Sequence, residues 1–340
     1  MDYKKVVISK YGGPDVLKVV EENNLPEPEQ NEIRVKVLVT SAAFTDTLLR
    51  MGKYPAVKDK PPFSPGYDMV GKVDKCGADV KTFSVGDKVA ALTVFGAYSE
   101  YMCINQERLL PVPKDLDSSE VVSLPLTYIT AYQMMHRAAK IQKGKSILIH
   151  GAGGAVGTAL LQLGKLLDLK MYGTGSKSKQ ELINKMGAVA IDYQSEDFVE
   201  KIKTLTGSGV DFVIDGIGGD YLKRSFSVLK PGGILVAYGF QKAVTGNGSM
   251  LSVVLDFIKL SLWNLLPNKK STTFYSITGM QKKHPDWFKE DFNSLLELLR
   301  QRKIAPVISY KLPLTDAVKA HELLDKATVE GKIVLTVAEE

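Results

Sequence analysis

The chain has 340 residues, of which 44% are hydrophobic and 24% are charged. This composition is typical of a globular protein and excludes a disordered or fibrous chain, and at about 150 residues per domain the length predicts two domains. The net charge of +6 comes from lysines and arginines scattered along the sequence, so charge alone does not distinguish nucleic acid from small anionic molecules as the ligand.

Short β-rich runs fill the first hundred residues. Gly, Pro and Asn separate these runs, which lie at 4–9, 16–21, 32–40, 69–77, 87–92 and 97–104. Such spacing predicts a compact, partly antiparallel β domain. Near residue 120 the pattern changes to helices that alternate with short apolar strands, which is typical of βαβ units around a parallel sheet.

The second half of the chain carries enough strands for a complete doubly wound parallel sheet. The predicted strands are 146–151, 170–175, 188–193, 210–215, 232–239 and 272–277. Helices are predicted between the first five of them, at 155–167, 178–186, 196–206 and 221–229. We therefore expect an α/β protein in which this sheet follows the β-rich domain.

The most hydrophobic segment, residues 250–266, carries Asp256 and Lys259. It falls short of the roughly 18 uninterrupted apolar residues that a membrane-spanning helix needs, so we predict no transmembrane segment. We interpret it as an amphipathic helix. Its apolar side can pack within the domain, roof a substrate cleft, join a dimer or touch a membrane, and packing is the simplest expectation.

The C-terminal part predicts a helix at 287–303 and then, within 310–337, a helix followed by a strand. This last strand can return to pair with the N-terminal β domain. One domain would then consist of residues 1–122 and 291–340, with residues 123–290 inserted as the other.

Only two cysteines occur, Cys76 and Cys103, too few for a disulfide framework or a four-thiolate zinc site. This cysteine content favours a reducing compartment, and we expect the cytoplasm. The N-terminus, MDYKKVVISK, lacks the apolar region of a signal peptide.

A glycine-rich turn follows the strand 146–151 and leads directly into a helix. Strand, turn and helix together are the context that the dinucleotide-binding fingerprint requires. The glycines let backbone N–H groups approach a pyrophosphate at the positive end of a helix dipole. The residues expected to contact the cofactor are Ala152, Gly153, Gly154, Val156 and Gly157, with Ala152 in the first glycine slot.

The end of the second strand indicates which cofactor is bound. An acidic residue there would hold the ribose 2′-hydroxyl of NAD, but this chain reads Gly175-Ser176-Lys177-Ser178-Lys179. Cations and hydroxyls can pair with a 2′-phosphate, which a carboxylate would repel. The sequence therefore predicts NADP(H), held by Ser176, Lys177 and Lys179. The alternative is that the lysines only open a solvated helix.

A second turn, Pro65-Gly66-Tyr67-Asp68, leads into a predicted strand. Pro and Gly shape such turns. Tyr67 is therefore either an ordinary half-buried aromatic residue or a side chain that the turn delivers to an active site.

Several motifs, in order along nearly the whole chain, resemble those of medium-chain dehydrogenase/reductases of the zinc-independent, quinone-oxidoreductase-like branch. They are GGPDVLKVVE, GDKVAAL, GAYSEYMCI, LPLTYITAY, HGAGGAVG, AIDY, LKPGGILVAYG and GKIVLTV. The resemblance implies a GroES-like catalytic domain, a Rossmann domain and hydride transfer in the cleft between them. It also implies a homodimer, with the edge strand 272–277 as a candidate contact.

The resemblance also bears on a metal. Zinc-dependent members bind the ion through a Cys, a His and a further thiolate, and the matching positions here are Ala43, Tyr67 and Leu126. Ala and Leu cannot coordinate zinc, which requires several nitrogen, sulfur or carboxylate ligands. We therefore expect no metal.

Other cofactor contacts follow from the resemblance alone. It implies that Thr130 lies beside the nicotinamide ring, that Tyr193 lies near the 2′-phosphate, and that Gly239 and Phe240 border the ribose–nicotinamide half. Tyr193 is equally well interpreted as an aromatic residue at a strand end.

The first-domain loop departs from the quinone reductases. They carry Asn and Tyr where this chain has Ala43 and Leu48, although Tyr54 is retained. The missing Asn weakens the assignment of a quinone as the substrate.

Without a metal, a substrate carbonyl must be polarised by hydrogen bonds, which suits acceptors that are already electron-poor. We expect NADPH-dependent reduction of a quinone or an α,β-unsaturated carbonyl, with Tyr54 and Tyr67 as candidate donors to the developing oxyanion. Both tyrosines can instead only line the cleft. The alternatives are an enoyl-thioester reductase and a non-enzymatic NADPH-binding protein, and no nucleic acid is required.

Overall fold

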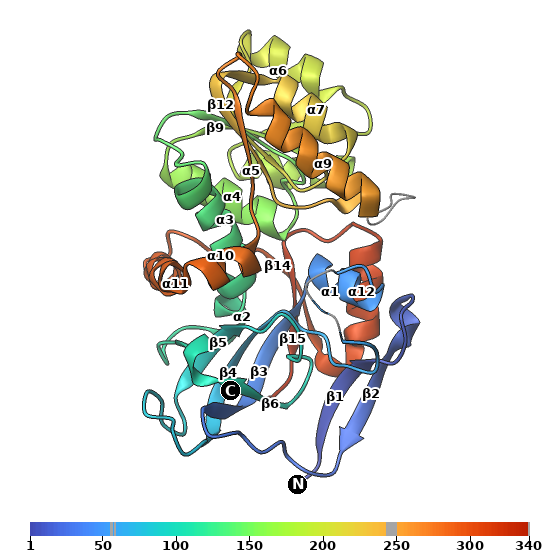
Figure 1. Cartoon of the computed structure of the whole chain (residues 1–340), viewed down its shortest axis with the longest axis vertical. Helices are drawn as coiled ribbons and strands as arrows, with labels where there is room; N and C mark the ends of the chain where they lie inside the picture. Colours follow the sequence, from blue (N-terminus) through green and yellow to red (C-terminus); the bar gives the residue numbers. More distant parts are fainter. Residues whose placement is uncertain (55–56, 58, 243–249, 339–340) are drawn as a thin grey trace. The chain divides into compact units, whose positions relative to one another are not determined.

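The computed structural model describes residues 1–54, 57, 59–242 and 250–338. The chain forms two compact units, which Figure 1 colours along the sequence. The β-rich unit comprises residues 1–126, 292–301 and those from 306 onward, and the second unit comprises 127–291 and 302–305.

The β-rich unit combines an antiparallel strand pair with a larger mixed sheet. Its strands are β1 (Tyr3–Ile8), β2 (Leu17–Glu22), β3 (Glu32–Ala42), β4 (Asp68–Cys76), β5 (Lys88–Leu92), β6 (Tyr101–Asn105), β7 (Leu110–Pro111), β14 (Ile308–Pro313) and β15 (Lys332–Thr336). The larger sheet has the order β14-β15-β3-β4-β5-β7, with β6 also paired to β3. Strand β15 pairs antiparallel with β3, which places Leu335 opposite Thr40. This confirms the predicted return of the last strand to the N-terminal β domain.

Alternation along β3 builds the core of this unit. Ile33, Val35 and Val37 are each 0% exposed, and they pack with buried side chains of β4 and β5. Successive side chains of a strand point to opposite faces, so this spacing buries one face of β3. The helices of the unit are α1 (Phe44–Arg50), α2 (Ser118–Val121) and α12 (Ala317–Asp325), with the second half of α11 (Pro285–Arg300).

The second unit is a doubly wound sheet, as predicted. Its strands are β8 (Ser146–Ile149), β9 (Lys170–Gly175), β10 (Val189–Asp192), β11 (Val210–Asp215), β12 (Leu229–Ala237) and β13 (Ser271–Phe274). They are all parallel and lie in the order β10-β9-β8-β11-β12-β13. This is the strand order of the dinucleotide-binding fold, with the order reversing between β8 and β11.

Helices connect these strands and complete the unit. They are α3 (Ile129–Gln133), α4 (Ala155–Leu166), α5 (Gln180–Lys185), α6 (Phe198–Thr206), α7 (Asp220–Ser227), α9 (Met250–Trp263) and α10 (Ile277–Lys283), with π-helical turns at Leu124–Tyr128 and Met134–Ala138. The strands carry buried apolar runs such as Ile147, Leu148 and Ile149, each 0% exposed. Such runs are expected where a parallel sheet is covered on both faces.

The strand predicted at 272–277 ends earlier in the structure. Strand β13 stops at Phe274, and Ser276 then caps helix α10 by accepting a hydrogen bond from the Gly279 N–H at 3.3 Å. A serine that satisfies the free N–H groups of a helix start ends the strand before it.

The hydrophobic segment does form a helix, α9, which buries some of its apolar residues, such as Leu260 at 4% exposed, and leaves others on the surface. Val254, Leu255, Ile258 and Leu262 are between 47% and 56% exposed. The one acidic residue, Asp256, is 2% exposed and accepts the Gly219 N–H at 2.9 Å. This anchor turns the carboxylate inward, and the four apolar side chains remain on the surface of α9, the orange helix labelled in Figure 1. No helix among the described residues is both long enough and apolar enough to span a bilayer.

Candidate cofactor and catalytic sites

The glycine turn lies between β8 and α4, at the carboxyl edge of the parallel sheet. Gly154 is the N-cap of α4 and has no side chain to cap the helix. The first N–H groups of α4 are therefore suited to an anionic ligand. A Cβ on Gly157 would lie 2.3 Å from the Gly151 carbonyl oxygen, so only glycine lets the helix approach the turn this closely. Of the fingerprint residues, Ala152, Gly153 and Gly154 lie in this turn, and Val156 and Gly157 lie in the first turn of α4.

A basic segment lies directly beside the turn. Ser176 and a 3-10 turn, Lys177–Lys179, follow β9. The Lys179 side chain crosses the glycine turn, because a Cβ on Gly153 would meet Lys179 Cδ at 2.8 Å. Tyr193 follows the adjacent strand β10, is 46% exposed, and donates its backbone N–H to the Gly175 carbonyl at 3.3 Å. The structure therefore places the residues predicted to bind the 2′-phosphate at the same carboxyl edge of the parallel sheet.

A buried hydrogen-bond network, which the sequence did not predict, connects the strand ends at this edge of the parallel sheet. His150 Nε2 lies 2.9 Å from Ser225 Oγ, which donates to Asp215 Oδ2 at 2.7 Å. His150 Nδ1 lies 3.1 Å from Thr174 Oγ1. Burial lowers the pKa of His150, so the imidazole is neutral and links the ends of β8, β9 and β11. In the sequence, the feature that could have indicated this network is the position of His150 immediately before the glycine turn.

Thr130 lies on α3 and is 5% exposed. Its hydroxyl hydrogen-bonds the Tyr275 phenol, whose pKa burial raises. The Tyr275 hydroxyl donates to Gln133 Oε1 at 2.9 Å, and Gln133 Nε2 donates to Asp291 Oδ2 at 2.8 Å. A chain of buried polar groups, formed by Tyr275, Gln133 and Asp291, thus holds Thr130 in place. The sequence did not predict these three residues.

Gly239 and Phe240 follow the end of β12. A Cβ on Gly239 would lie 2.8 Å from the Gly216 carbonyl oxygen, so the backbone passes close to the loop after β11. The Phe240 ring stacks on Phe274 at 5.3 Å between centroids and lies 5.0 Å from Phe257. The structure therefore places this ring in an aromatic cluster with β13 and α9.

The Pro65–Asp68 turn in the β-rich unit is held from helix α1. Asp46 Oδ1 accepts the Gly66 N–H, and Asp46 Oδ2 accepts the Ala43 N–H, each at 2.9 Å. Gly66 has φ +107°, and a Cβ there would lie 2.8 Å from the Ala97 carbonyl carbon. Burial is the main cause that raises the pKa of Asp46 to about 7.

Asp68 fixes the other end of the same turn through a buried ion pair. Lys332 Nζ lies 2.8 Å from Asp68 Oδ2, and the side chains are 3% and 0% exposed. Ser41 Oγ donates to Asp68 Oδ1 at 2.5 Å. The first strand of the larger sheet and the last strand of the described chain therefore meet at this carboxylate.

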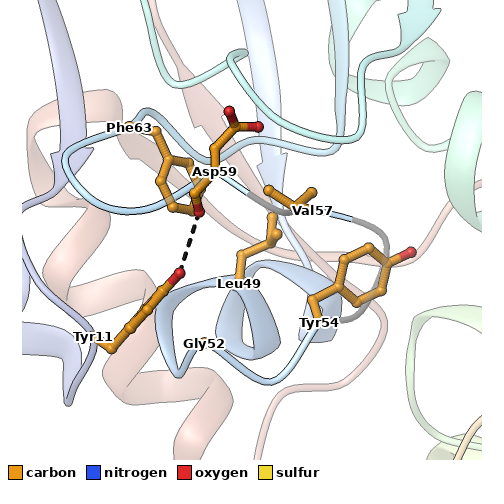
Figure 2. Close-up of a pocket in the computed structure, with 7 residues that line it drawn as sticks. All are labelled: Tyr11, Leu49, Gly52, Tyr54, Val57, Asp59 and Phe63. Carbon is orange, nitrogen blue, oxygen red and sulfur yellow. Dashed lines mark hydrogen bonds between the residues drawn. The ribbon is translucent and has the colours of Figure 1, made fainter.

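The two candidate tyrosines lie together. The Tyr54 and Tyr67 hydroxyls are hydrogen-bonded, and the rings meet edge to face at 5.7 Å and 86°. Tyr67 is 0% exposed, whereas Tyr54 is half-buried. Tyr54 also lines a small pocket with Tyr11, Leu49 and Phe63 that has room for about one water molecule. In Figure 2 its hydroxyl points away from this pocket.

Comparisons with known proteins agree with these features. The model of the alcohol dehydrogenase GroES-like domain matches residues 29–114, and the zinc-binding dehydrogenase model matches residues 186–335. A 2-haloacrylate reductase from Burkholderia sp. is 31% identical over 344 residues, which cover 97% of each chain. The chain belongs to the medium-chain dehydrogenase/reductase superfamily. The predicted family and fold class are therefore confirmed.

Two further members show the range of this superfamily. The synaptic vesicle membrane protein VAT-1 homolog of Danio rerio is 29% identical over 340 residues, which cover 98% of this chain and 70% of the relative. The crystal structure of the Escherichia coli quinone oxidoreductase complexed with NADPH superimposes with a TM-score of 0.86 at 29% identity, covering 98% of this chain and 99% of that one.

Zinc does not fit the residues that this member of the superfamily carries. Ala43, Tyr67 and Leu126 occupy the three positions that the sequence comparison assigned to zinc ligands. Within the described ranges, no three His, Cys, Asp or Glu side chains gather in a way that could hold a metal ion.

Proposed function

We propose that this protein is an NADPH-dependent oxidoreductase that reduces a quinone or an α,β-unsaturated carbonyl without zinc. The observation that supports it best is the glycine turn at the start of α4 with Ser176, Lys177 and Lys179 beside it and no acid among them. NADPH, when bound, supplies a hydride. The α4 N–H groups would hold its pyrophosphate, and the lysines its 2′-phosphate.

The substrate class follows from the groups available to polarise a carbonyl. In the β-rich unit the candidate is the half-buried Tyr54 phenol, which is hydrogen-bonded to the fully buried phenol of Tyr67. A phenol can stabilise the delocalised oxyanion of a reduced enone or quinone. The related 2-haloacrylate reductase, named for a conjugated substrate, supports the same class.

The test is a fluorescence titration with NADPH and NADH, followed by turnover assays with the tighter cofactor. The substrate panel contains quinones, enals, enones, 2-haloacrylates and enoyl thioesters. We expect tighter binding of NADPH and turnover of a quinone or a small enone. Preferential binding of NADH contradicts the cofactor assignment. Turnover of the thioesters alone indicates an acyl reductase, and NADPH binding without any turnover indicates a non-enzymatic role.

We also propose a homodimer, formed through α9 instead of the edge of β13. Asn264 Oδ1 accepts the Thr272 N–H at 2.6 Å, and Asn264 Nδ2 donates to the Thr272 carbonyl at 3.0 Å. The side chain thus occupies the outer edge of β13, as natural proteins do to block strand pairing. The exposed row Val254, Ile258 and Leu262 recurs at helical spacing, and a second copy of α9 can cover it around a two-fold axis.

Light scattering of purified protein tests this dimer. Leu262→Asp should yield monomers, because it places a charge in the apolar face. The matched control is Val189→Asp, which adds the same charge to the 43% exposed Val189 on the opposite edge strand, β10. A monomeric wild type, or a Leu262→Asp variant that stays dimeric, overturns the proposal.

We also propose a cytoplasmic location for the protein. The support is chemical: Cys76 and Cys103 are both free thiols and both half-buried. Imaging of the tagged protein, with the thiols trapped by alkylation, tests this location.

A further inference from the structure

The carboxylate of Asp215 accepts hydrogen bonds on both of its oxygens, and the donors belong to different parts of the second unit. Oδ1 accepts the N–H groups of Ile217 and Gly218 at 2.8 and 3.1 Å, in the loop after β11. Oδ2 accepts the Ser225 hydroxyl at 2.7 Å. Asp215 and Ser225 are both 0% exposed. One buried carboxylate therefore fixes the loop after β11 and also binds the side chain that leads to His150.

The donors and acceptors of this network run in one direction. Because the Ser225 hydrogen goes to Asp215, the Ser225 oxygen accepts from His150 Nε2, which therefore carries the proton of the neutral imidazole. Nδ1 of the ring is then an acceptor, and the Thr174 hydroxyl donates to it. Thr174 Oγ1 in turn accepts the Gly151 N–H at 3.3 Å. The chain thus begins at the glycine turn and ends at the buried carboxylate.

Aromatic side chains shield the His150 imidazole from solvent. The Phe198 ring meets it edge to face at 4.7 Å between centroids, and the Tyr221 ring lies at 5.4 Å. His150 itself is 1% exposed. A hydrogen bond is electrostatically stronger in such surroundings than in water. The bond from His150 to Ser225 is therefore a firm connection.

This bond crosses between the two halves of the doubly wound sheet. His150 follows β8 and Thr174 lies in β9, in the half that carries the glycine turn. Asp215 ends β11 and Ser225 lies on α7, in the other half. Each half of such a sheet binds one mononucleotide of a dinucleotide. The proposed 2′-phosphate residues follow β9, so the first half would take the adenosine part of NADPH and the second half its nicotinamide part.

We propose that His150 is a positioning residue that ties the two mononucleotide-binding halves together through Ser225, so that the adenosine and nicotinamide parts of NADPH bind in a fixed relation. This inference rests on the proposed function, because it concerns how the proposed cofactor is held. The chain sets the loop after β11 relative to the glycine turn before the cofactor arrives. NADPH then binds without the entropic cost of ordering these two segments against each other.

Ser225→Ala tests this role because it removes the hydroxyl between the halves and leaves the contact of Thr174 with Gly151. Calorimetric titration compares NADPH with 2′-phospho-ADP-ribose, which lacks only the nicotinamide. We expect NADPH to bind about tenfold more weakly, since a hydrogen bond to a charged group is worth at least that factor. The affinity for 2′-phospho-ADP-ribose should stay within about twofold. A merely structural role would weaken both ligands by the same factor.

The matched control is Ser227→Ala, the same substitution on the same helix. The Ser227 hydroxyl donates to the Arg224 carbonyl at 2.7 Å and lies outside the network. Both affinities should stay within about twofold of the wild type in this variant.

A second measurement needs neither a ligand nor the Ser225 variant. In wild-type protein labelled with ¹⁵N at histidine, the imidazole signals absent from His150→Phe belong to His150. We expect these signals to show a neutral ring with its proton on Nε2. A proton on Nδ1 overturns the proposal, because Nε2 would then accept the Ser225 hydrogen and the connection to Asp215 would be broken.

The outcomes separate this inference from the proposed function. Ser225→Ala that weakens both ligands equally, or neither, overturns the positioning role, while binding of NADPH by the wild type still supports the proposed cofactor. Wild-type protein that binds neither ligand overturns the proposed cofactor and this inference with it.

Discussion

Lys332→Met should destabilise the β-rich unit strongly, because it leaves the Asp68 carboxylate buried without its counter-ion. The ammonium lies 2.8 Å from Asp68 Oδ2, with both side chains at most 3% exposed. Removing one partner of such a pair costs about 3–5 kcal/mol. For a unit of this size, about 2–4 °C of melting temperature is lost per kcal/mol, so we expect a decrease of about 6–20 °C.

Thermal unfolding followed by circular dichroism measures this loss, and hydrogen exchange of β3, β4 and β15 assigns it to the β-rich unit. The control is the double variant Asp68→Leu with Lys332→Met, which replaces both charges by apolar groups of similar size. It should recover most of the lost stability, as buried ion pairs replaced as a pair usually do. A melting temperature of Lys332→Met within about 2 °C of the wild type refutes the reasoning. A double variant as unstable as the single one shows that packing, not the unpaired charge, causes the loss.

Three further predictions concern other residues. Lys177→Ala should weaken NADPH binding by about tenfold or more and leave NADH binding unchanged, which fluorescence titration with both cofactors measures, because in the proposed complex the lost ammonium would pair with the 2′-phosphate that only NADPH carries. Gly157→Ala should abolish NADPH binding and lower the melting temperature, since its Cβ would lie 2.3 Å from the Gly151 oxygen; retained binding in the same titration contradicts this contact. Asp46 should make the unfolding free energy fall as pH rises from about 4 to about 7, because burial raises its folded pKa from 3.8 to about 7 and the native state then holds a proton that the unfolded chain releases. Denaturant titrations at several pH values should show a slope of up to about 1.4 kcal/mol per pH unit in the wild type, and an equal slope in Asp46→Asn would assign it to another group.

The sequence predicted the parts of this protein that local pattern determines. Alternating apolar residues located the strands, and the strand–turn–helix context of Gly151–Gly157 located the cofactor turn. The family resemblance, not a local pattern, implied that Tyr193 lies near Ser176 and Lys177, and in the structure these residues follow the neighbouring strands β10 and β9. The sequence of the Pro65–Asp68 turn also showed that Tyr67 occupies a position that the family resemblance assigns to a zinc ligand.

The remaining features depend on contacts between distant parts of the chain. The Lys332–Asp68 pair joins residues 264 positions apart, and no local pattern marks either partner. The His150–Ser225–Asp215 network is similarly assembled from three separate elements. The simplest expectation for α9, packing within the domain, did not indicate its exposed apolar face for another reason: the acidic residue of the helix, Asp256, is buried by a backbone contact that periodicity does not reveal. The hydrophobic pattern predicts which residues tend to be buried. It does not predict that one buried carboxylate, here that of Asp256, determines which face of a helix points to solvent.

The position of β15 has a consequence for how the protein is made. On the ribosome, residues 127–291 emerge and can fold while the β-rich unit still lacks the strand that completes its sheet. Asp68 is synthesised before Lys332, so its carboxylate lacks its counter-ion until Lys332 has been made. The turn that carries Tyr67 therefore becomes fully supported only after Lys332 has been synthesised. Until β15 emerges, an edge of β3 is unpaired and exposed to other nascent chains, and molecular chaperones that shield strand edges should act on the chain during this interval.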